Sequence, residues 1–235
     1  MKTIVILSVL FWLPLQVIGW LNDVDTSLLV GVNSQHTPYL DTFMWLCSRK
    51  WEWIPFYVSI LYVVFRNFSY REALYCLIAV AVVILFTDAF AAQIIRPSVG
   101  RMRPSNPDNP ISEMIHIVGN HRGGRFGFPS THASNTWGLA FFIAWLFRRH
   151  WLTLFLSLWA VLVCYSRLYL GVHYPGDLLV GMLLGFLGAT IVYWVFVRIT
   201  GHQTLTDVVH PYLPVIVGLL TIAVFLVLPF FFMVT

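Results

Sequence analysis

Charged residues are scarce in this sequence. Only 10% of its 235 residues are Asp, Glu, Lys or Arg, whereas a soluble domain carries about 25%. Apolar residues make up 59%, and the mean hydropathy is +0.79. A chain of this composition cannot cover a water-facing surface with charge. The composition therefore excludes an ordinary soluble domain and indicates a membrane protein.

Cysteine is also scarce. Cys47, Cys76 and Cys164 have no paired spacing, which argues against a disulfide framework and against a cysteine-based metal site. His116 and His121 could form a pair of metal ligands, but no carboxylate or cysteine cluster accompanies them. The sequence therefore predicts no metal and no cofactor.

The net charge of +4 comes from fourteen basic and ten acidic residues. Six arginines lie close to the polar segments of the chain and not in a terminal tail: Arg96, Arg101, Arg103, Arg122, Arg125 and Arg167. This clustering predicts a local anionic ligand and argues against a nucleic-acid partner.

Long apolar runs alternate with short polar turns and predict an all-α fold, a polytopic transmembrane helical bundle. Six core spans are expected at 1–21, 53–65, 73–95, 133–147, 151–165 and 178–199, with an additional C-terminal apolar run at 211–234. Residues 1–21 can also be interpreted as a signal peptide. Val17-Ile18-Gly19 fits a cleavage site poorly, so a retained span is favoured.

Three regions are predicted along the chain. Residues 1–52 hold the first span or signal peptide, followed by amphipathic helices at the membrane interface, because residues 20–52 mix apolar and polar side chains. Residues 53–200 form the transmembrane core that carries the chemistry. Residues 201–235 form the C-terminal apolar span.

Two features of the core helices predict packing. Gly181, Gly185 and Gly188 recur in the 178–199 run and predict a face of small residues for close helix contact. Asp88 interrupts the 73–95 run, and a carboxylate in that position is expected to face the bundle interior.

Alternation of the spans places the polar segments 96–129 and 166–177 on one membrane face and the turns 66–72 and 148–150 on the other. Arginines in these turns put them in the cytoplasm by the positive-inside tendency. Arg49 and Lys50 count against this orientation. The loop arginines are discounted because they are expected to bind a ligand, so the polar segments are predicted to face outward.

The segment 166–177 groups ionisable side chains between two apolar runs. His173 can act as a nucleophile or base, and Asp177 can accept its second ring N–H and fix its tautomer. Pro175 interrupts the helical pattern between them, so their spacing of four does not imply a regular helical turn. In a purely structural interpretation, Arg167 and Asp177 would form an ion pair that caps two helices.

The 96–132 region suits a phosphate. Arg96 and Arg103 offer guanidinium groups, and Ser130-Thr131 begin an apolar run whose helix N-terminus would favour an anion. His132 could share acid–base chemistry with His173. Alternatively, the arginines only anchor the helix among lipid headgroups.

These residues resemble the type 2 phosphatidic acid phosphatase and vanadate haloperoxidase superfamily, whose pattern is K-x6-R-P, P-S-G-H and S-R-x5-H-x3-D. Two positions differ, since Arg96 replaces the Lys of the pattern and Thr131 replaces its Gly. Haloperoxidases are typically soluble, so the spans favour the membrane lipid-phosphatase branch. The corresponding segments of this chain are Arg96-x6-Arg103-Pro104, Pro129-Ser130-Thr131-His132 and Ser166-Arg167-x5-His173-x3-Asp177.

The resemblance implies a metal-independent phosphatase. His173 would attack phosphorus to give a phosphohistidine, Asp177 would orient it, and His132 would protonate the leaving oxygen. It also implies which residues bind the phosphate: Arg96, Arg103, Ser130, Thr131 and Arg167.

The implied partner is a phosphorylated lipid at the outer face of a bacterial cytoplasmic membrane. Lipid A phosphate is favoured, with undecaprenyl diphosphate next, and the oligomeric state is left open. A second hypothesis is a non-enzymatic membrane protein that binds anionic lipid or transports a phosphorylated solute. A transporter should show inverted repeats with interrupted helices, and the sequence has no sign of them.

Overall fold

The computed structural model describes residues 19–202, 205 and 207–234. These residues form helices and loops without a strand, apart from an isolated bridge between Met102 and Phe126. The all-α prediction is confirmed. The first predicted span, 1–21, lies almost wholly outside the described residues.

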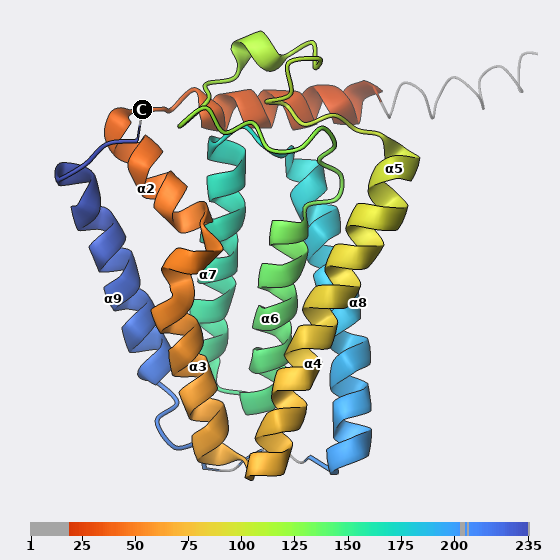
Figure 1. The fold of residues 1–235 in the computed structure, drawn as a ribbon, viewed down its shortest axis with the longest axis vertical. Coiled ribbons are helices and arrows are strands. Elements are labelled where there is room, and N and C mark those ends of the chain that lie inside the picture. Colours follow the sequence, from red (N-terminus) through yellow and green to blue (C-terminus); the bar gives the residue numbers. More distant parts are fainter. Residues whose placement is uncertain (1–18, 203–204, 206, 235) are drawn as a thin grey trace, which may run out of the picture.

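Seven helices form an upright bundle with α6 in its middle, and two of them, α2 and α3, follow each other end to end (Figure 1). Shorter segments join them: the 3-10 helix η1 (Lys50–Trp53) between α2 and α3, the π-helical segment Phe90–Ile95 and α5 (Arg96–Val99) after α4, and two more 3-10 turns at Ser112–Met114 and Leu228–Phe230. The bundle helices are α2 (Pro38–Ser48), α3 (Ile54–Asn67), α4 (Tyr70–Ala89), α6 (Thr131–Phe147), α7 (His150–Tyr169), α8 (Pro175–Thr200) and α9 (Leu213–Val227).

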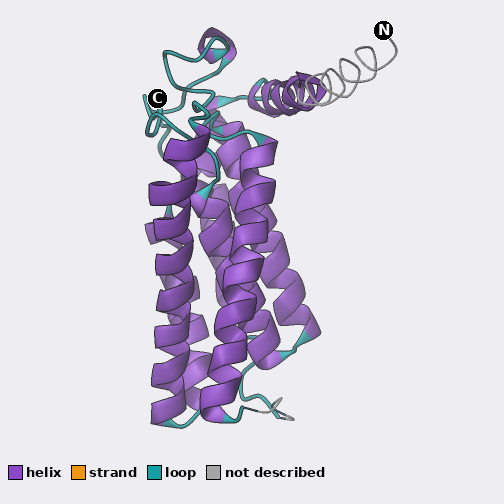
Figure 2. Cartoon of the chain, turned by 90° about the vertical axis from the view of Figure 1, so that its right-hand side faces the viewer, coloured by secondary structure: helices purple, strands orange, loops and turns teal. Residues whose placement is uncertain are grey.

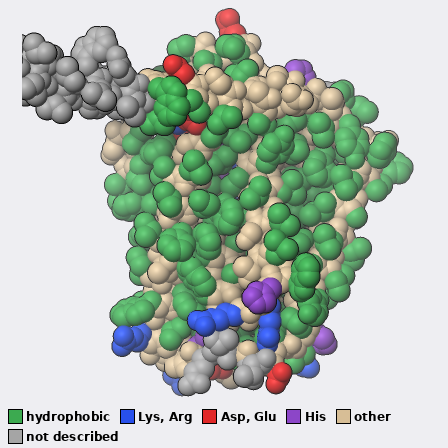
Figure 3. Space-filling view, turned by 180° about the vertical axis from the view of Figure 1, so that it is seen from behind, with side chains coloured by type: hydrophobic (Ala, Val, Ile, Leu, Met, Phe, Trp, Pro, Cys, Tyr) green, Lys and Arg blue, Asp and Glu red, His purple; other side chains and the backbone are tan. Residues whose placement is uncertain are grey.

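Four helical segments of the described chain are long and apolar enough to cross a bilayer: Tyr70–Val99, His150–Tyr169, Pro175–Thr200 and Leu213–Phe230. They match three of the six predicted core spans and the additional C-terminal run. Two further core spans correspond to α3 and α6, which have only 14 and 17 residues, and the span 1–21 lies almost wholly outside the described residues. The bundle wall is nevertheless apolar over most of its height (Figure 3). Large side chains such as Leu85 and Trp194 are exposed there. Lipid removes this surface from water, so the chain is a multi-pass membrane protein.

Two helices lie in the region 20–52, where interfacial helices were predicted. A helix over residues 19–33 lies across one end of the bundle, nearly perpendicular to the upright helices (Figures 1 and 2). The second helix, α2, instead stands in the bundle and packs against α7. Phe43, Leu46 and Cys47 are buried in its contact with the core. An apolar face on a short helix fits a protein core as well as a membrane surface, which is why the sequence could not distinguish the two.

Glycines on α8 let it approach α6 closely. A Cβ atom at Gly181 would lie 2.5 Å from the Ser130 carbonyl oxygen, and one at Gly185 would lie 2.4 Å from that of Ser134. The predicted small-residue face is therefore confirmed. This close contact with α8 fixes the position of the N-terminal end of α6.

The polar segments gather at one end of the bundle, as predicted. The loop 100–129, the start of α6 and the α7–α8 hinge lie at the end crossed by helix 19–33, whereas the turns 66–72 and 148–150 lie at the other (Figure 1). Three motif segments that are distant in sequence can therefore meet.

Candidate active site

His173 and Asp177 form a pair where α8 begins. Pro175 starts the helix, and Asp177 lies in its first turn. The Asp177 Oδ2 atom accepts a hydrogen bond from the Tyr174 backbone N–H at 3.0 Å and lies 3.3 Å from His173 Nδ1. Both side chains of the pair are fully buried. The predicted partnership is confirmed, and it arises at a helix start, not within a regular turn.

The other ring nitrogen of His173 faces an arginine. Arg103 Nη1 lies 2.9 Å from His173 Nε2 and donates to the Val172 carbonyl oxygen, also at 2.9 Å. A guanidinium only donates, so Nε2 must be the acceptor and Nδ1 carries the proton toward Asp177. Burial, followed by the charges of Arg103 and two more arginines, lowers the pKa of His173 well below its ordinary value. The ring is a neutral imidazole.

Three arginines converge on this histidine. Arg96 Nη2 donates to the Pro129 carbonyl oxygen and to Thr131 Oγ1, both at 3.2 Å. Arg167 donates through Nη1 to a serine hydroxyl of α2, Ser48. Burial, and then the charge of Arg96, lowers the pKa of Arg103 to about 10.

Each of the three guanidinium groups has a buried Nε donor without a partner among the described residues. The Nε atoms of Arg96, Arg103 and Arg167 are buried and have no hydrogen-bond partner within the described part of the chain. An unsatisfied buried donor costs about 1–3 kcal/mol, and three of them in one place indicate a ligand with several acceptor oxygens.

A π-helical segment, Phe90–Ile95, brings Asp88 and Arg96 to the same side of their helix. Eight residues of regular α-helix would separate them by about 80°, and the extra residue of a π-bulge removes most of this angle. Both then reach α6, where Asp88 Oδ1 accepts a hydrogen bond from Asn135 Nδ2 at 3.0 Å. Asp88 therefore faces the bundle interior, as predicted.

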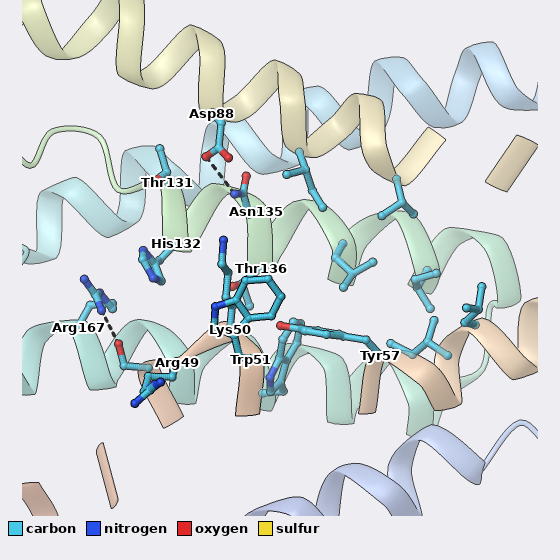
Figure 4. A pocket seen from close by; sticks show the side chains of 18 of the residues that line it. Arg49, Lys50, Trp51, Tyr57, Asp88, Thr131, His132, Asn135, Thr136 and Arg167 are labelled. Atoms are coloured by element: carbon cyan, nitrogen blue, oxygen red, sulfur yellow. Dashed lines mark hydrogen bonds between the residues drawn. The ribbon is translucent and has the colours of Figure 1, made fainter. Parts of the chain in front are cut away.

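Ser130 joins the start of α6 to the histidine–aspartate pair. Its hydroxyl caps the helix by accepting from the Ala133 backbone N–H at 3.4 Å, and its own N–H donates to the Asp177 carbonyl oxygen at 2.9 Å. His132 follows in the first turn of α6 and lies near Arg167 (Figure 4). The helix N-terminus adds a partial positive charge to the same site.

The structural interpretation, in which Arg167 pairs with Asp177, is wrong. Asp177 is held by Arg101, whose Nη1 atom lies 3.1 Å from Asp177 Oδ1. Arg101 also forms an ion pair with Asp25, which projects from helix 19–33. Asp25 in turn accepts a hydrogen bond from the Gly176 backbone N–H at 2.7 Å.

Sequence reasoning missed three of these residues. In the sequence, Arg101 counts only among the arginines expected to bind a ligand, and neither Arg101 nor Asp25 belongs to a motif. Gly127 was also missed, although a Cβ atom there would lie 3.0 Å from Asp177 Oδ2 and 3.1 Å from Arg103 Cγ. No local pattern in the sequence identifies them, because their roles depend on contacts between distant segments.

The two histidines considered as metal ligands have other partners. His116 Nε2 lies 2.9 Å from Asp41 Oδ2, and its ring stacks on His36. His121 packs edge-on against Trp45. Within the described residues, no group of three or more His, Cys, Asp or Glu side chains could hold a metal ion.

A cavity of about 930 Å³ leads away from the site between α3, α4 and α6. It starts at His132 and Arg167 and continues past Asp88 to Cys76 on α4 (Figure 4). Asp88 and Cys76 are twelve residues apart on α4, a distance of about 18 Å along the helix. This part of the cavity is therefore slightly longer than half of a hydrocarbon core, which is about 30 Å thick. Beyond Thr136 the lining is mostly apolar. The cavity thus has one polar and one apolar end.

The sequence profile of the PAP2 superfamily matches residues 72–201, more than half of the chain. The chain belongs to the PAP2 superfamily. The match covers all three motif segments, so the resemblance is confirmed, and with it the prediction that the chain is a phosphatase.

Three PAP2 relatives illustrate the similarity. A lipid A 4'-phosphatase of Bacteroides thetaiotaomicron is 46% identical over 185 residues, covering 79% of this chain and 82% of the relative. A protein of the same name from Porphyromonas gingivalis is 34% identical over 176 residues, covering 74% and 73%. The crystal structure of a transmembrane PAP2 type phosphatidylglycerolphosphate phosphatase from Bacillus subtilis has a TM-score of 0.57 at 22% identity, covering 78% and 89%, and therefore shares the fold.

Proposed function

We propose that this PAP2 phosphatase removes a phosphate from a lipid headgroup, with lipid A as the favoured substrate and undecaprenyl diphosphate next. The observation that carries the proposal is the set of three unpartnered Nε donors around a neutral His173. One of these arginines, Arg167, also lines the polar end of a cavity that continues into the apolar bundle. The relatives named lipid A 4'-phosphatase support the choice of lipid.

In the first step, the lone pair on His173 Nε2 attacks phosphorus, and the bond from phosphorus to the lipid oxygen breaks. His132 gives its proton to the leaving oxygen, so the lipid departs as an alcohol or a phosphate. Asp177 accepts the Nδ1–H bond and stabilises the positive charge that develops on the ring. The product on the enzyme is a phosphohistidine.

In the second step, a water molecule attacks the phosphohistidine. His132 now takes a proton from the water, the N–P bond breaks, and inorganic phosphate leaves while His173 returns to its neutral form. Arg96, Arg103 and Arg167 bind the phosphoryl oxygens through both steps, together with the Ser130–Thr131 start of α6. Fixed guanidinium charges supply the stabilisation that a metal ion supplies in other phosphatases.

We also propose six membrane crossings within residues 38–230. In this arrangement α2, η1 and α3 cross the bilayer as one broken segment, and α6 crosses inside the bundle. Arg66, Arg71, Arg148 and Arg149 lie at the end opposite the site. The positive-inside tendency then places the active site at the outer face of a bacterial cytoplasmic membrane.

Phosphate release by the purified chain from a panel of lipids tests the function. The panel contains lipid A, undecaprenyl diphosphate, phosphatidylglycerol phosphate and phosphatidic acid, each assayed with EDTA present. We expect turnover of lipid A to persist in EDTA and to be inhibited competitively by vanadate. Loss of activity in EDTA, restored by Mg²⁺ or Zn²⁺, would contradict the metal-independent mechanism, and no release from any lipid would contradict the function.

A further inference from the structure

The polar lining of the cavity extends beyond the site that holds the transferred phosphate. On α6 it continues from His132 to Asn135 and Thr136, which adds about one helical turn, or roughly 5 Å. Asp88 lies on the α4 side of this stretch. A lipid whose hydrocarbon began directly at the hydrolysed phosphate would place apolar atoms against these side chains. The headgroup should therefore carry further polar atoms here.

Lys50 lies on the opposite wall of the cavity. It belongs to η1, the break between α2 and α3, and Figure 4 shows its side chain directed toward the α6 wall, on which Asn135 and Thr136 lie. Its ammonium group lies 5.1 Å from the centre of the Trp51 ring. None of the ion pairs found in the described residues involves Lys50.

The other charges along the cavity already have partners or a role. Arg49 pairs with Glu52 at 3.4 Å, and Arg167 belongs to the site that holds the transferred phosphate. Asp88, the carboxylate of the lining, accepts the hydrogen bond from Asn135. Lys50 is exposed but lines this mostly apolar cavity. Its ammonium group is therefore available to a second anion, which a partly apolar site binds more strongly than water-exposed charges do.

Resting on the proposed lipid phosphatase function, we propose that Lys50 forms a second anion-binding subsite. It binds a phosphate that the substrate carries in addition to the one that is hydrolysed. Two lipids supply this chemistry: a diphosphate, whose second phosphate adjoins the first, and a lipid A with phosphates on both sugars. Through Lys50 the enzyme would bind either of these lipids more tightly than a lipid with a single phosphate.

Equilibrium binding in a His173→Ala background tests the subsite without turnover. The probes are undecaprenyl diphosphate against undecaprenyl phosphate, and lipid A with two phosphates against lipid A with only the 4'-phosphate, all in detergent micelles. Adding Lys50→Gln should weaken binding of the two-phosphate member of at least one pair about tenfold and its one-phosphate partner less than twofold. The affected pair identifies the source of the second phosphate.

Two control variants make the result specific. Lys50→Arg should restore the preference for two phosphates, since it keeps the charge. Arg66→Gln removes an exposed cation from the last turn of α3, at the end of the bundle opposite the site, and should leave the preference unchanged. Equal weakening of both members of each pair, or no weakening, would overturn the subsite. Failure of the proposed function is separate, because it is measured as absent phosphate release by the wild-type chain.

Discussion

The chemistry of His173 depends on neighbours that oppose its protonation. Its Nε2 atom faces Arg103, and its Nδ1 atom faces Asp177, so one ring nitrogen is kept free of a proton and the other is kept protonated. The surrounding arginines that would bind phosphate also keep the His173 ring neutral. In the proposed mechanism, one set of charges therefore serves phosphate binding and activation of His173 together.

The titration of His173 follows from this arrangement. Its pKa is lowered, so the neutral ring should persist as the pH falls through 6.5 and should be lost only at a lower pH. Imidazole ¹⁵N NMR of the full chain in micelles, with His173→Gln to assign the signal, measures the midpoint. Replacing Arg96 by Gln should raise the midpoint, because one opposing charge is removed. A midpoint at or above 6.5 in the wild type would refute the lowered pKa.

His132 should matter in proportion to the leaving group. A lipid alkoxide needs a proton as it departs, whereas nitrophenolate does not, so His132→Ala should slow lipid hydrolysis by about 10²–10⁴. Hydrolysis of p-nitrophenyl phosphate should fall much less. The check is kcat for both substrates with the same enzyme preparation. An equal loss on both would remove the general-acid role from His132.

At the scale of elements, helix 19–33 is more than a surface attachment. Asp25 contacts Arg101, and Arg101 contacts Asp177, so this helix supports the carboxylate that orients His173. Asp25 also accepts a hydrogen bond from Gly176 in the first turn of α8. The position of helix 19–33 is thereby coupled to the geometry of the His173–Asp177 pair.

Asp25→Asn tests this coupling. The amide keeps an acceptor for the Gly176 N–H but loses the charge that holds Arg101, so the Asp177 carboxylate should be less well fixed. We expect kcat to fall roughly tenfold with little change in KM, since orientation and not binding is affected. Steady-state kinetics of Asp23→Asn, an exposed acid on the same helix, provide the matched control. The coupling is absent if both variants behave alike.

The sequence predicts local patterns better than it predicts contacts between distant segments. The His173–Asp177 pair, the Ser130 cap and the glycine face of α8 could be predicted, because each depends on spacing within one segment. The contact of Arg101 with Asp25 joins residues 76 positions apart. It depends on where helix 19–33 crosses the bundle, which no single segment encodes. The placement of α2 in the bundle could not be predicted for the same reason.

At the scale of the whole molecule, sidedness decides which lipids can reach the site. Met114 is 62% exposed at the active-site end, and His150 is exposed at the other. In cells with a permeabilised outer envelope, a membrane-impermeant thiol reagent should label Met114→Cys and spare His150→Cys until the cytoplasmic membrane is opened. Cys47 and Cys76 are buried and Cys164 is partly buried, so the wild type gives the background. Labelling of His150→Cys but not of Met114→Cys would show that the protein has the opposite orientation in the membrane.

The phosphohistidine is the central claim, and trapping it is the most direct test. The purified chain is mixed with lipid A carrying an isotopically labelled 4'-phosphate, quenched within milliseconds in alkali, and digested for mass spectrometry. We predict label on the peptide that contains His173, bound through nitrogen and therefore stable to alkali and labile to acid. His173→Ala should neither take up label nor release phosphate. Turnover by the wild type with no label on His173 at any quench time, or substantial turnover by His173→Ala, would contradict the account.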